Sequence, residues 1–304
     1  MVDITHKSNT KRTAVAQAIV HTSSTDTISA IKENKVPKGN VLDFARAAAL
    51  LAVKNTSNSI PDCHPLPIEH CKVDYKLIKK DIIIKLTVET IYKTGVEVEA
   101  MHGAMIAALT IYDMLKPIDK ELVIGDIKLL EKKGGKSSFK DQVGENIKTK
   151  IIVCSDSIAA GKKEDRAGKA IAEKLEKYQI NASCEIIADD ASQIKAKIEE
   201  AKASKIDLLL FTGGTGLSPR DITPETIQPL LDREIPGLME AARSYGQDRT
   251  HYAMLSRGVS GMIGGLLVIT LPGSTKGATE SMDALFPYIL HIFKVAKGYR
   301  HDKM

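Results

Sequence analysis

The sequence predicts two domains of different classes, an α+β sandwich followed by a doubly wound α/β domain with a parallel sheet. Its 304 residues exceed the roughly 100–200 residues of one average domain, so two domains are expected. In the first half, segments of strand and helix character do not alternate regularly, which favours α+β. In the second half, short apolar strands alternate with helices, which is typical of a parallel, doubly wound sheet.

The composition excludes several classes of protein. Charged residues make up 27% and apolar residues 43%, far from a disordered chain. No apolar run approaches the roughly 18 residues of a membrane helix, and the N-terminus lacks the apolar core of a secretory signal. Four cysteines without a C-x-x-C pair fit a reducing cytoplasm. The small basic excess, 43 against 38, and 4% aromatic residues favour small anionic ligands over nucleic acid.

The first half contains two predicted helices and two predicted strands. Residues 41–54 are rich in alanine and place apolar residues at helical spacing, which predicts a helix. Residues 81–90 are β-branched and partly alternating, which predicts a strand. Residues 100–114 are small and apolar nearly all round, which predicts a buried helix. Residues 121–130 return to strand character.

A stretch rich in Gly, Lys and Ser at residues 134–150 separates the two halves. We therefore expect domains at residues 1–140 and 149–304, joined by a linker at residues 141–148. In the second domain, strands are predicted at residues 149–154, 183–187 and 206–211, and helices near residues 166–177 and 191–203. Sheets of this kind bind ligands beyond the carboxyl ends of their strands.

The third of these strands runs directly into Thr212-Gly213-Gly214-Thr215-Gly216. Small residues leave backbone N–H groups unobstructed, which favours a phosphate cradle. Because the segment lacks both the lysine of a Walker loop and G-x-G-x-x-G spacing, a tight glycine turn is an equal alternative. A later strand ends in Leu271-Pro272-Gly273-Ser274, with Lys276 available to an anion.

Several carboxylates follow strand segments beside this loop. Asp221 stands just ahead of a helix whose first turn suits Pro224, so it is either an N-cap or a group that holds Mg²⁺ beside a bound triphosphate. Asp156, Asp189 and Asp190 also end strand-like segments. Carboxylates that converge beside a phosphate loop suit nucleotidyl transfer.

The motifs SDS, DRAG, TGGTG, PRDITPE, MLSRGVSG and LPGSTKG occur in this order within residues 149–297. They resemble the molybdopterin-binding domain shared by MogA, MoaB and the eukaryotic molybdenum insertion proteins. The resemblance implies Mg²⁺- and ATP-dependent adenylylation of molybdopterin with release of pyrophosphate. It places the family's catalytic acids, which also hold the metal, at Asp189 and Asp221, although Ala188 replaces the family's proline. Its implied substrate-binding residues are Ser155, Asp156, Thr212, Gly213, Gly214, Thr215, Gly216, Ser256, Pro272, Gly273 and Ser274.

The alternative for this domain is a module that binds molybdopterin or scaffolds pathway partners without adenylyltransferase activity. Measurement of pyrophosphate release would separate the two.

In the first half, a loop between Pro61 and Pro67 carries Cys63 and His64. With His70 and Cys71 they invite a zinc interpretation, but adjacent Cys-His pairs lack the spacing that points neighbouring ligands at one metal. We expect His64 to bind hydrogen-bond partners or an anion instead.

Further polar residues of the first half are grouped in three places. Glu97-Val98-Glu99 alternates, which predicts a strand with both carboxylates on one side; a solvated face is the alternative. Asp113 and Lys116 share one face at the end of the predicted buried helix. They form either a salt bridge or an acid/base pair with pKa values shifted by burial and by each other. Lysines at turns, including Lys38, Lys132 and Lys136, favour a polyphosphate site.

The ordered motifs KGNV, IPDCHPLPIE, GVEVEA, ALTIYDM and LLEKKGGKS across residues 1–140 resemble MoaC, cyclic pyranopterin monophosphate synthase. The resemblance implies a ferredoxin-like α+β fold and conversion of 3′,8-cyclo-7,8-dihydro-GTP into cyclic pyranopterin monophosphate with release of pyrophosphate. Asp113 and Lys116 would be the acid/base centre, with Lys38 near the reacting groups. The implied substrate-binding residues are Arg12, Asp62, Cys63, His64, Glu97, Val98, Glu99, Lys132 and Lys136. No cofactor is assigned to this domain.

Together these observations predict a bifunctional, cytoplasmic enzyme of molybdenum cofactor biosynthesis. Its expected partners are pterin and nucleotide substrates and other enzymes of the pathway, but neither nucleic acid nor membrane. The apolar helix and the loop at residues 63–66 need covering surface, and the family resemblance implies a site shared between subunits. We therefore expect a homo-oligomer built on dimers, up to a hexamer.

Overall fold

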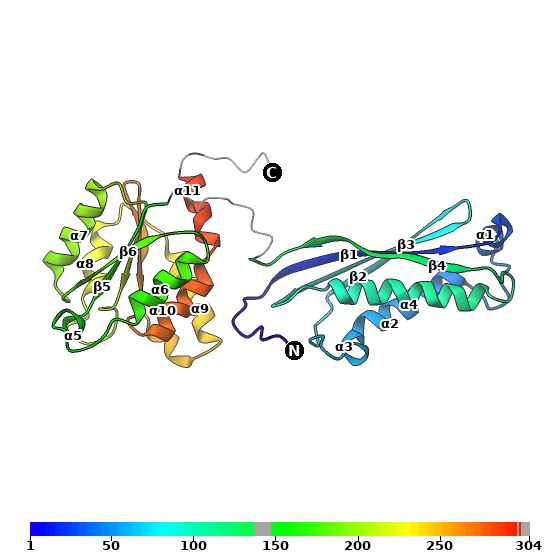
Figure 1. Ribbon diagram of the computed structural model, residues 1–304, viewed down its shortest axis with the longest axis horizontal. Helices are drawn as coiled ribbons and strands as arrows, with labels where there is room; N and C mark the ends of the chain where they lie inside the picture. Colours follow the sequence, from blue (N-terminus) through cyan, green and yellow to red (C-terminus); the bar gives the residue numbers. More distant parts are fainter. Residues whose placement is uncertain (137–146, 297, 299–304) are drawn as a thin grey trace. The chain divides into compact units, whose positions relative to one another are not determined.

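The computed structural model describes residues 1–136, 147–296 and 298. The chain divides into two compact units, Met1–Ser138 and Phe139–Met304 (Figure 1). Residues 141–146 of the expected linker lie outside the described residues. Ile147, near the end of that segment, is buried in the core of the second unit.

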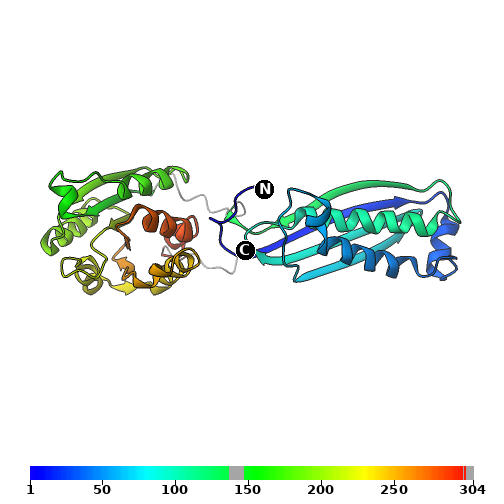
Figure 2. The ribbon, with the colours of Figure 1, turned by 90° about the horizontal axis from the view of Figure 1, so that it is seen from below.

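Unit 1 is one antiparallel sheet with helices on one face. The strands have the order β2-β3-β1-β4, and the connectivity is strand, helix, strand, strand, helix, strand. Figures 1 and 2 show α2 and α4 side by side on the same face of this sheet. Its elements are β1 (Thr10–His21), α1 (Thr25–Lys32), α2 (Val41–Lys54), α3 (Thr56–Ser59), β2 (His70–Ile78), β3 (Asp81–Tyr92), α4 (Glu97–Leu115) and β4 (Val123–Lys133).

The helix layer of unit 1 depends on small residues. Gly103 of α4 lies so close to α2 that an added Cβ would stand 2.5 Å from Val53, so only glycine fits there without movement of a neighbour. α4 was expected to be buried nearly all round, and this is wrong on one side. Met105 is 46% exposed and Leu109 54% exposed, because the sheet and α2 cover only part of the helix surface.

Unit 2 has a six-stranded sheet in the order β6-β5-β7-β10-β9-β8. Its elements are β5 (Thr149–Cys154), α5 (Asp156–Ala159), α6 (Ala167–Glu176), β6 (Ala182–Ile187), α7 (Ala191–Ala203), β7 (Leu208–Thr212), α8 (Thr223–Ile227), η3 (Gln228–Leu230), β8 (Arg233–Glu234), α9 (Pro236–Gln247), η4 (His251–Leu255), β9 (Ser260–Ile263), β10 (Leu266–Leu271), α10 (Thr275–Leu285), η5 (Tyr288–His291) and α11 (Ile292–Val295).

The sheet of unit 2 is parallel in one part only, which corrects the expectation of a wholly parallel sheet. Four strands run parallel to one another, namely β6, β5, β7 and β10. β9 pairs antiparallel with β10, and β8 pairs antiparallel with β9. Gly264 and Gly265 alone join β9 to β10, and a two-residue turn can join only antiparallel strands. Gly264 has φ +60°, as such turns require.

Helices cover both faces of this sheet, as the doubly wound class predicts. α6 and α10 enclose one core around Ile171, Leu175 and Met282, and α7 encloses the other around Ile194 and Ile198. The carboxyl ends of the parallel strands therefore open into loops at one edge. Among the described residues, no helix has the length and apolarity needed to cross a membrane.

Candidate active sites

A cluster of opposite charges lies at the C-terminal end of α4. Lys116 Nζ lies 2.7 Å from Asp113 Oδ1, and Lys38 Nζ lies 2.7 Å from Oδ2 of the same carboxylate. Lys38 also donates to the Asp113 carbonyl oxygen at 2.8 Å. The structure thus brings the three predicted catalytic residues of the first domain together, although Lys38 is 75 residues away in sequence.

These three side chains are not buried, which corrects the expectation for the helix end. Asp113 is 52% exposed and Lys116 54% exposed, although the neighbouring Met114 and Leu115 are buried in the core. Hydrogen bonds from Lys116 and then Lys38 lower the pKa of Asp113 to about 2. The hydrogen bond to Asp113 raises the pKa of Lys116. At neutral pH the cluster therefore holds one carboxylate and two ammonium groups.

Glu97, Val98 and Glu99 form the first turn of α4 rather than a strand, so the predicted alternation is wrong. Successive residues of a helix are turned by about 100°, so the two carboxylates do not share a side as they would in a strand. Glu99 is only 4% exposed, and burial together with the Glu97 carboxylate raises its pKa.

A cavity of about 340 Å³ lies at this N-terminal end of α4. Six predicted substrate-binding residues line it, namely Asp62, Cys63, His64, Glu97, Val98 and Glu99. The sequence analysis missed Val2, Ile4 and Lys7, which line the cavity from the first residues of the chain. No spacing or periodicity in that segment marked them.

Arg12 and Lys132 lie at the same end of unit 1. Arg12 Nε donates to the Tyr92 carbonyl oxygen at 3.3 Å, and its second amino group donates to that of Lys93 at 3.2 Å. Lys132 forms an ion pair with Glu97. Lys136 follows β4 a few residues later.

The two predicted groups of the first domain therefore lie at opposite ends of one helix. Sixteen residues separate Glu97 from Asp113, and at about 1.5 Å per residue they are about 24 Å apart along the helix axis. A single copy of unit 1 does not bring the acid/base cluster to the cavity.

In unit 2, three loops meet at the carboxyl ends of the parallel strands. Gly213 has φ +99°, and an added Cβ would stand 2.1 Å from the Cys154 carbonyl oxygen. Gly273 lies against it, since its own added Cβ would stand 3.1 Å from Gly213 Cα. Thr212 Oγ1 donates to the Pro272 carbonyl oxygen at 2.8 Å. The glycines are thus required for close packing as well as for an open loop.

Asp156 and Asp189 hold the ends of β5 and β6 together. The backbone N–H of Asp189 donates to Asp156 Oδ1 at 3.0 Å, and that of Asp156 donates to Asp189 Oδ2 at 3.3 Å. Asp189 Oδ1 is buried without a hydrogen-bond partner among the described residues. Burial raises the pKa of Asp189, and the carboxylates of Asp156 and Asp221 add to that effect.

Asp221 does not cap α8, so the capping alternative is wrong. Ile222 is the N-cap residue, and no side chain caps the helix. Asp221 Oδ2 instead accepts from the Ser218 N–H at 2.9 Å and lies beside Gly216. Asp190 is the capping residue of α7.

Arg257 is a residue that the sequence analysis missed. Its Nε donates to the Gly216 carbonyl oxygen at 2.8 Å, and a guanidinium amino group donates to the Asp221 carbonyl oxygen, also at 2.8 Å. It forms an ion pair with Glu225 as well. Arg257 thus fixes the end of the glycine loop relative to Asp221. The only indication of its role in the sequence was its place beside the predicted Ser256 in the motif MLSRGVSG.

The donor set suits Mg²⁺ bound together with a nucleotide. Mg²⁺ is commonly held by one or two carboxylates plus substrate phosphates and water. Asp189 offers a buried oxygen without a partner, and Asp221 lies across the same glycine loop. Among the described residues no three His, Cys, Asp or Glu side chains form a ready-made metal cage. The carboxylates present therefore fit a nucleotide-bound ion rather than a structural metal.

A cavity of about 560 Å³ lies beside the glycine loop. It is lined by six predicted residues, Thr215, Gly216, Ser256, Pro272, Gly273 and Ser274, and by Arg243, Tyr252, Lys276 and Glu280. The predicted Ser155, Asp156, Thr212, Gly213, Gly214, Asp189 and Asp221 do not line it. The predicted residues thus form two adjoining groups, acids around the glycine loop and hydroxyls around the cavity.

Comparison with known proteins agrees with both halves of this arrangement. Residues 1–135 match the MoaC family, and residues 150–291 match the probable molybdopterin binding domain. A "Molybdenum cofactor biosynthesis bifunctional protein" from Chlorobaculum tepidum is 39% identical over 306 residues, covering 99% of this chain and 96% of that protein. The chain belongs to this bifunctional family.

Two further relatives each match one domain. A cyclic pyranopterin monophosphate synthase of Clostridium perfringens is 50% identical over 139 residues, covering 45% of this chain and 87% of that protein. The solved structure of the molybdopterin biosynthesis enzyme MoaB from Thermus thermophilus is 40% identical to this chain. It covers 50% of this chain and 98% of its own, with a TM-score of 0.47. The two family matches and the bifunctional relative show that this protein of molybdenum cofactor biosynthesis joins a MoaC domain to a probable molybdopterin binding domain, called the MogA/MoaB-type domain below.

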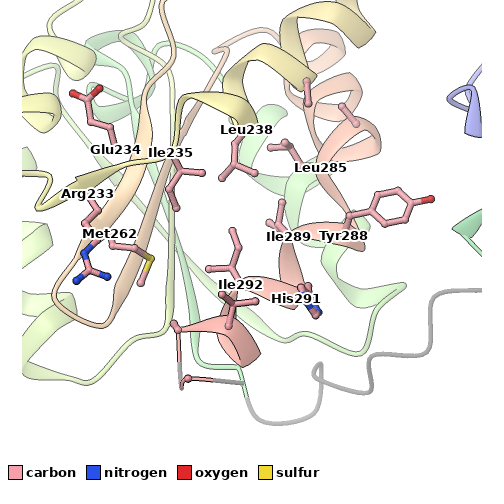
Figure 3. A pocket seen from close by; sticks show the side chains of 15 residues that line it. Arg233, Glu234, Ile235, Leu238, Met262, Leu285, Tyr288, Ile289, His291 and Ile292 are labelled. Atoms are coloured by element: carbon pink, nitrogen blue, oxygen red, sulfur yellow. The ribbon is translucent and has the colours of Figure 1, made fainter. Parts of the chain in front are cut away.

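The MogA/MoaB-type domain has a second cavity, of about 720 Å³, away from the predicted residues. Figure 3 shows Ile235, Leu238, Leu285, Ile289 and Ile292 around it, and most of its lining is apolar. No predicted site residue is among the described residues that line this cavity, so it has no part in the candidate active site.

Proposed function

We propose that the MoaC domain converts 3′,8-cyclo-7,8-dihydro-GTP into cyclic pyranopterin monophosphate, with pyrophosphate as the leaving group. The observation that carries this proposal is the Lys38–Asp113–Lys116 cluster, in which each carboxylate oxygen contacts one lysine at 2.7 Å. We assign this domain, residues 1–140, to the ferredoxin-like class on its connectivity.

The charge state of the cluster determines the roles of its members. Asp113 is ionised because its pKa is about 2, but it is a weak base while both lysines contact it, so it accepts a proton only once the substrate draws a lysine away. Lys116 is protonated, and the contact with Asp113 that raises its pKa also makes it a weak proton donor until the substrate breaks that contact. Lys38 contacts the same carboxylate and keeps the charge of Asp113 balanced while protons move.

The cavity at the other end of α4 supplies the binding groups. His64, Glu97 and Glu99 provide hydrogen-bonding groups for the pterin ring, and Arg12, Lys132 and Lys136 provide positive charge for the triphosphate. Since about 24 Å separates the two ends of the helix in one copy, we infer that a second copy completes each site. We therefore propose a homo-oligomer built on dimers, with a hexamer as the largest assembly.

For the second domain, residues 149–304, we propose transfer of AMP from ATP to molybdopterin with release of pyrophosphate. The observation that supports it is the pair of acids, Asp189 and Asp221, on either side of the Gly213–Gly216 loop. The backbone of that loop would bind phosphate, and the adjoining cavity with Ser256 and Ser274 would hold the pterin. Mg²⁺ held by the two acids would neutralise charge on the transferred group. We place both reactions in the cytoplasm, where free cysteines are usual. Other enzymes of the pathway are the partners we propose, because the chain belongs to a family of molybdenum cofactor biosynthesis.

Pyrophosphate release by the purified full chain tests both proposals. With 3′,8-cyclo-7,8-dihydro-GTP, release without ATP is expected from the MoaC domain. With molybdopterin, release that needs both ATP and Mg²⁺ is expected from the second domain. If molybdopterin binds but no pyrophosphate appears, the second domain is a binding or scaffolding module.

A further inference from the structure

The cavity beside the glycine loop has an aromatic side chain at its mouth. Tyr252, on η4, is 80% exposed, and no other aromatic side chain among the described residues lines this cavity. Leu255 of the same segment is 51% exposed and also lines it. Met254 between them is 62% exposed but does not line it. The mouth thus presents one flat ring and one aliphatic side chain to solvent.

The backbone that carries Tyr252 is fixed at both ends. At one end, Gly246 of α9 packs so closely that an added Cβ would stand 2.8 Å from the Ala253 methyl group, and the Thr250 N–H donates to the Gly246 carbonyl oxygen at 2.8 Å. At the other end, Arg257 is held by Gly216 and Asp221. The ring therefore projects from a defined position, which reduces the entropy lost when a ligand packs on it.

The inner walls of the cavity suit anions. Lys276 is largely exposed, and its nearest carboxylate, Glu280, lies 3.9 Å away. Arg243, from α9, also lines the cavity, so among the described residues two cations and the single carboxylate of Glu280 face it. Ser274 caps α10 beside them and accepts from the Gly277 N–H at 3.2 Å. A flat apolar mouth with cationic walls matches a fused nitrogen heterocycle that carries a phosphate, and about 560 Å³ is ample for one.

We propose that Tyr252 is the stacking platform for the heterocycle of the ligand in this cavity. The assignment rests on the proposed function, in which this domain binds both molybdopterin and ATP. Both ligands have the required chemistry, a pterin or an adenine ring with phosphate. Stacking against the tyrosine ring holds the heterocycle at the mouth, while Lys276 and Arg243 attract the anionic end.

Equilibrium binding to the full chain tests the proposal, with molybdopterin and MgATP measured separately. Tyr252→Ala removes the ring, Tyr252→Phe keeps it, and Met254→Ala is the matched control on the same segment. Titration calorimetry measures both affinities, because it needs no fluorescence from either ligand. We expect Tyr252→Ala to lower the affinity for one of the two ligands about tenfold. Tyr252→Phe and Met254→Ala should bind both ligands with unchanged affinity. All melting temperatures should stay unchanged.

The ligand whose affinity falls shows which heterocycle stacks on Tyr252. Weaker molybdopterin binding assigns the platform to the pterin, and weaker MgATP binding assigns it to adenine. Unchanged affinity of Tyr252→Ala for both ligands overturns the proposal, as does Tyr252→Phe binding as weakly as the alanine variant. If the unaltered chain binds neither ligand, the proposed function of the domain fails, and the stacking assignment fails with it.

Discussion

Asp113 and Asp189 place the same side chain in opposite electrostatic environments. Two lysines lower the pKa of Asp113 to about 2, so its carboxylate is ionised at neutral pH. Burial raises the pKa of Asp189, and its Oδ1 has no partner among the described residues. Two lysines hold the first carboxylate in its ionised form, whereas the second leaves a buried oxygen for a cation.

The first prediction concerns the cluster of the MoaC domain. Asp113→Asn and Lys116→Ala should each reduce formation of cyclic pyranopterin monophosphate by about 100-fold or more, since a proton-transfer group is lost. The fold should persist because both side chains are exposed. The matched control is Asp74→Asn, which removes another exposed Asp–Lys pair, with Lys72, on β2. Normal turnover by Asp113→Asn would show that the cluster is a surface salt bridge without a catalytic role.

The second prediction concerns how the ionisation of Asp189 makes the stability of the fold depend on pH. A carboxyl group with a raised folded-state pKa binds its proton more tightly in the folded chain. Its contribution to stability is therefore greatest below the unfolded value of 3.8 and is lost as the pH rises through the folded value. Asp189→Asn should raise the melting temperature at pH 7, should give no advantage below pH 3.8, and should abolish AMP transfer.

Asp190→Asn is the control for that variant, because asparagine also caps a helix and Asp190 caps α7. It should keep both activity and stability. A melting temperature of Asp189→Asn below that of the unaltered chain at pH 7 would show that Asp189 stabilises the fold instead.

At the scale of single elements, the sequence predicts long segments better than short ones. Residues 41–54 and 191–203 have the predicted helix boundaries, since their apolar spacing continues over several turns. Glu97-Val98-Glu99 was wrong because three residues cannot distinguish alternation in a strand from the first turn of a helix. The antiparallel β8 has only two residues, too few for a pattern. Lys38 reaches Asp113 through the tertiary fold, which no spacing shows; only the family resemblance indicated it.

The third prediction tests the glycine loop as an element. Gly214 and Gly264 both have φ +60°, so alanine at either costs about 1–2 kcal/mol from the left-handed backbone alone. Alanine at Gly264 meets nothing within 4 Å, whereas at Gly214 its Cβ would stand 2.2 Å from Thr223 Oγ1 and 2.8 Å from Asp189 Oδ1. Gly214→Ala should therefore lower the melting temperature more and should abolish AMP transfer. Equal melting temperatures for the two variants would exclude the close packing.

At the scale of the whole molecule, the two proposed reactions are assigned to separate units with separate cores. Gly214→Ala should consequently leave the MoaC reaction intact, which the same purified sample can show. Within the MoaC domain, by contrast, two parts of one proposed site are far apart. The Lys38–Asp113–Lys116 cluster and the cavity with His64 lie at opposite ends of α4, about 24 Å from each other. The site of this domain is therefore expected to extend over two copies of the chain.

The last prediction tests that shared site by complementation. Asp113→Asn damages the C-terminal end of α4, and His64→Ala damages the cavity at the other end. Each variant alone should be inactive. In a randomly mixed two-fold dimer with two shared sites, half of the dimers are mixed, and each mixed dimer keeps one intact site. Coexpression should then restore about a quarter of the activity. Asp113→Asn mixed with Lys116→Ala should restore none, because both changes damage the same half of the site. No recovery in the first mixture, or light scattering that shows an active monomer, would place the whole site within one copy.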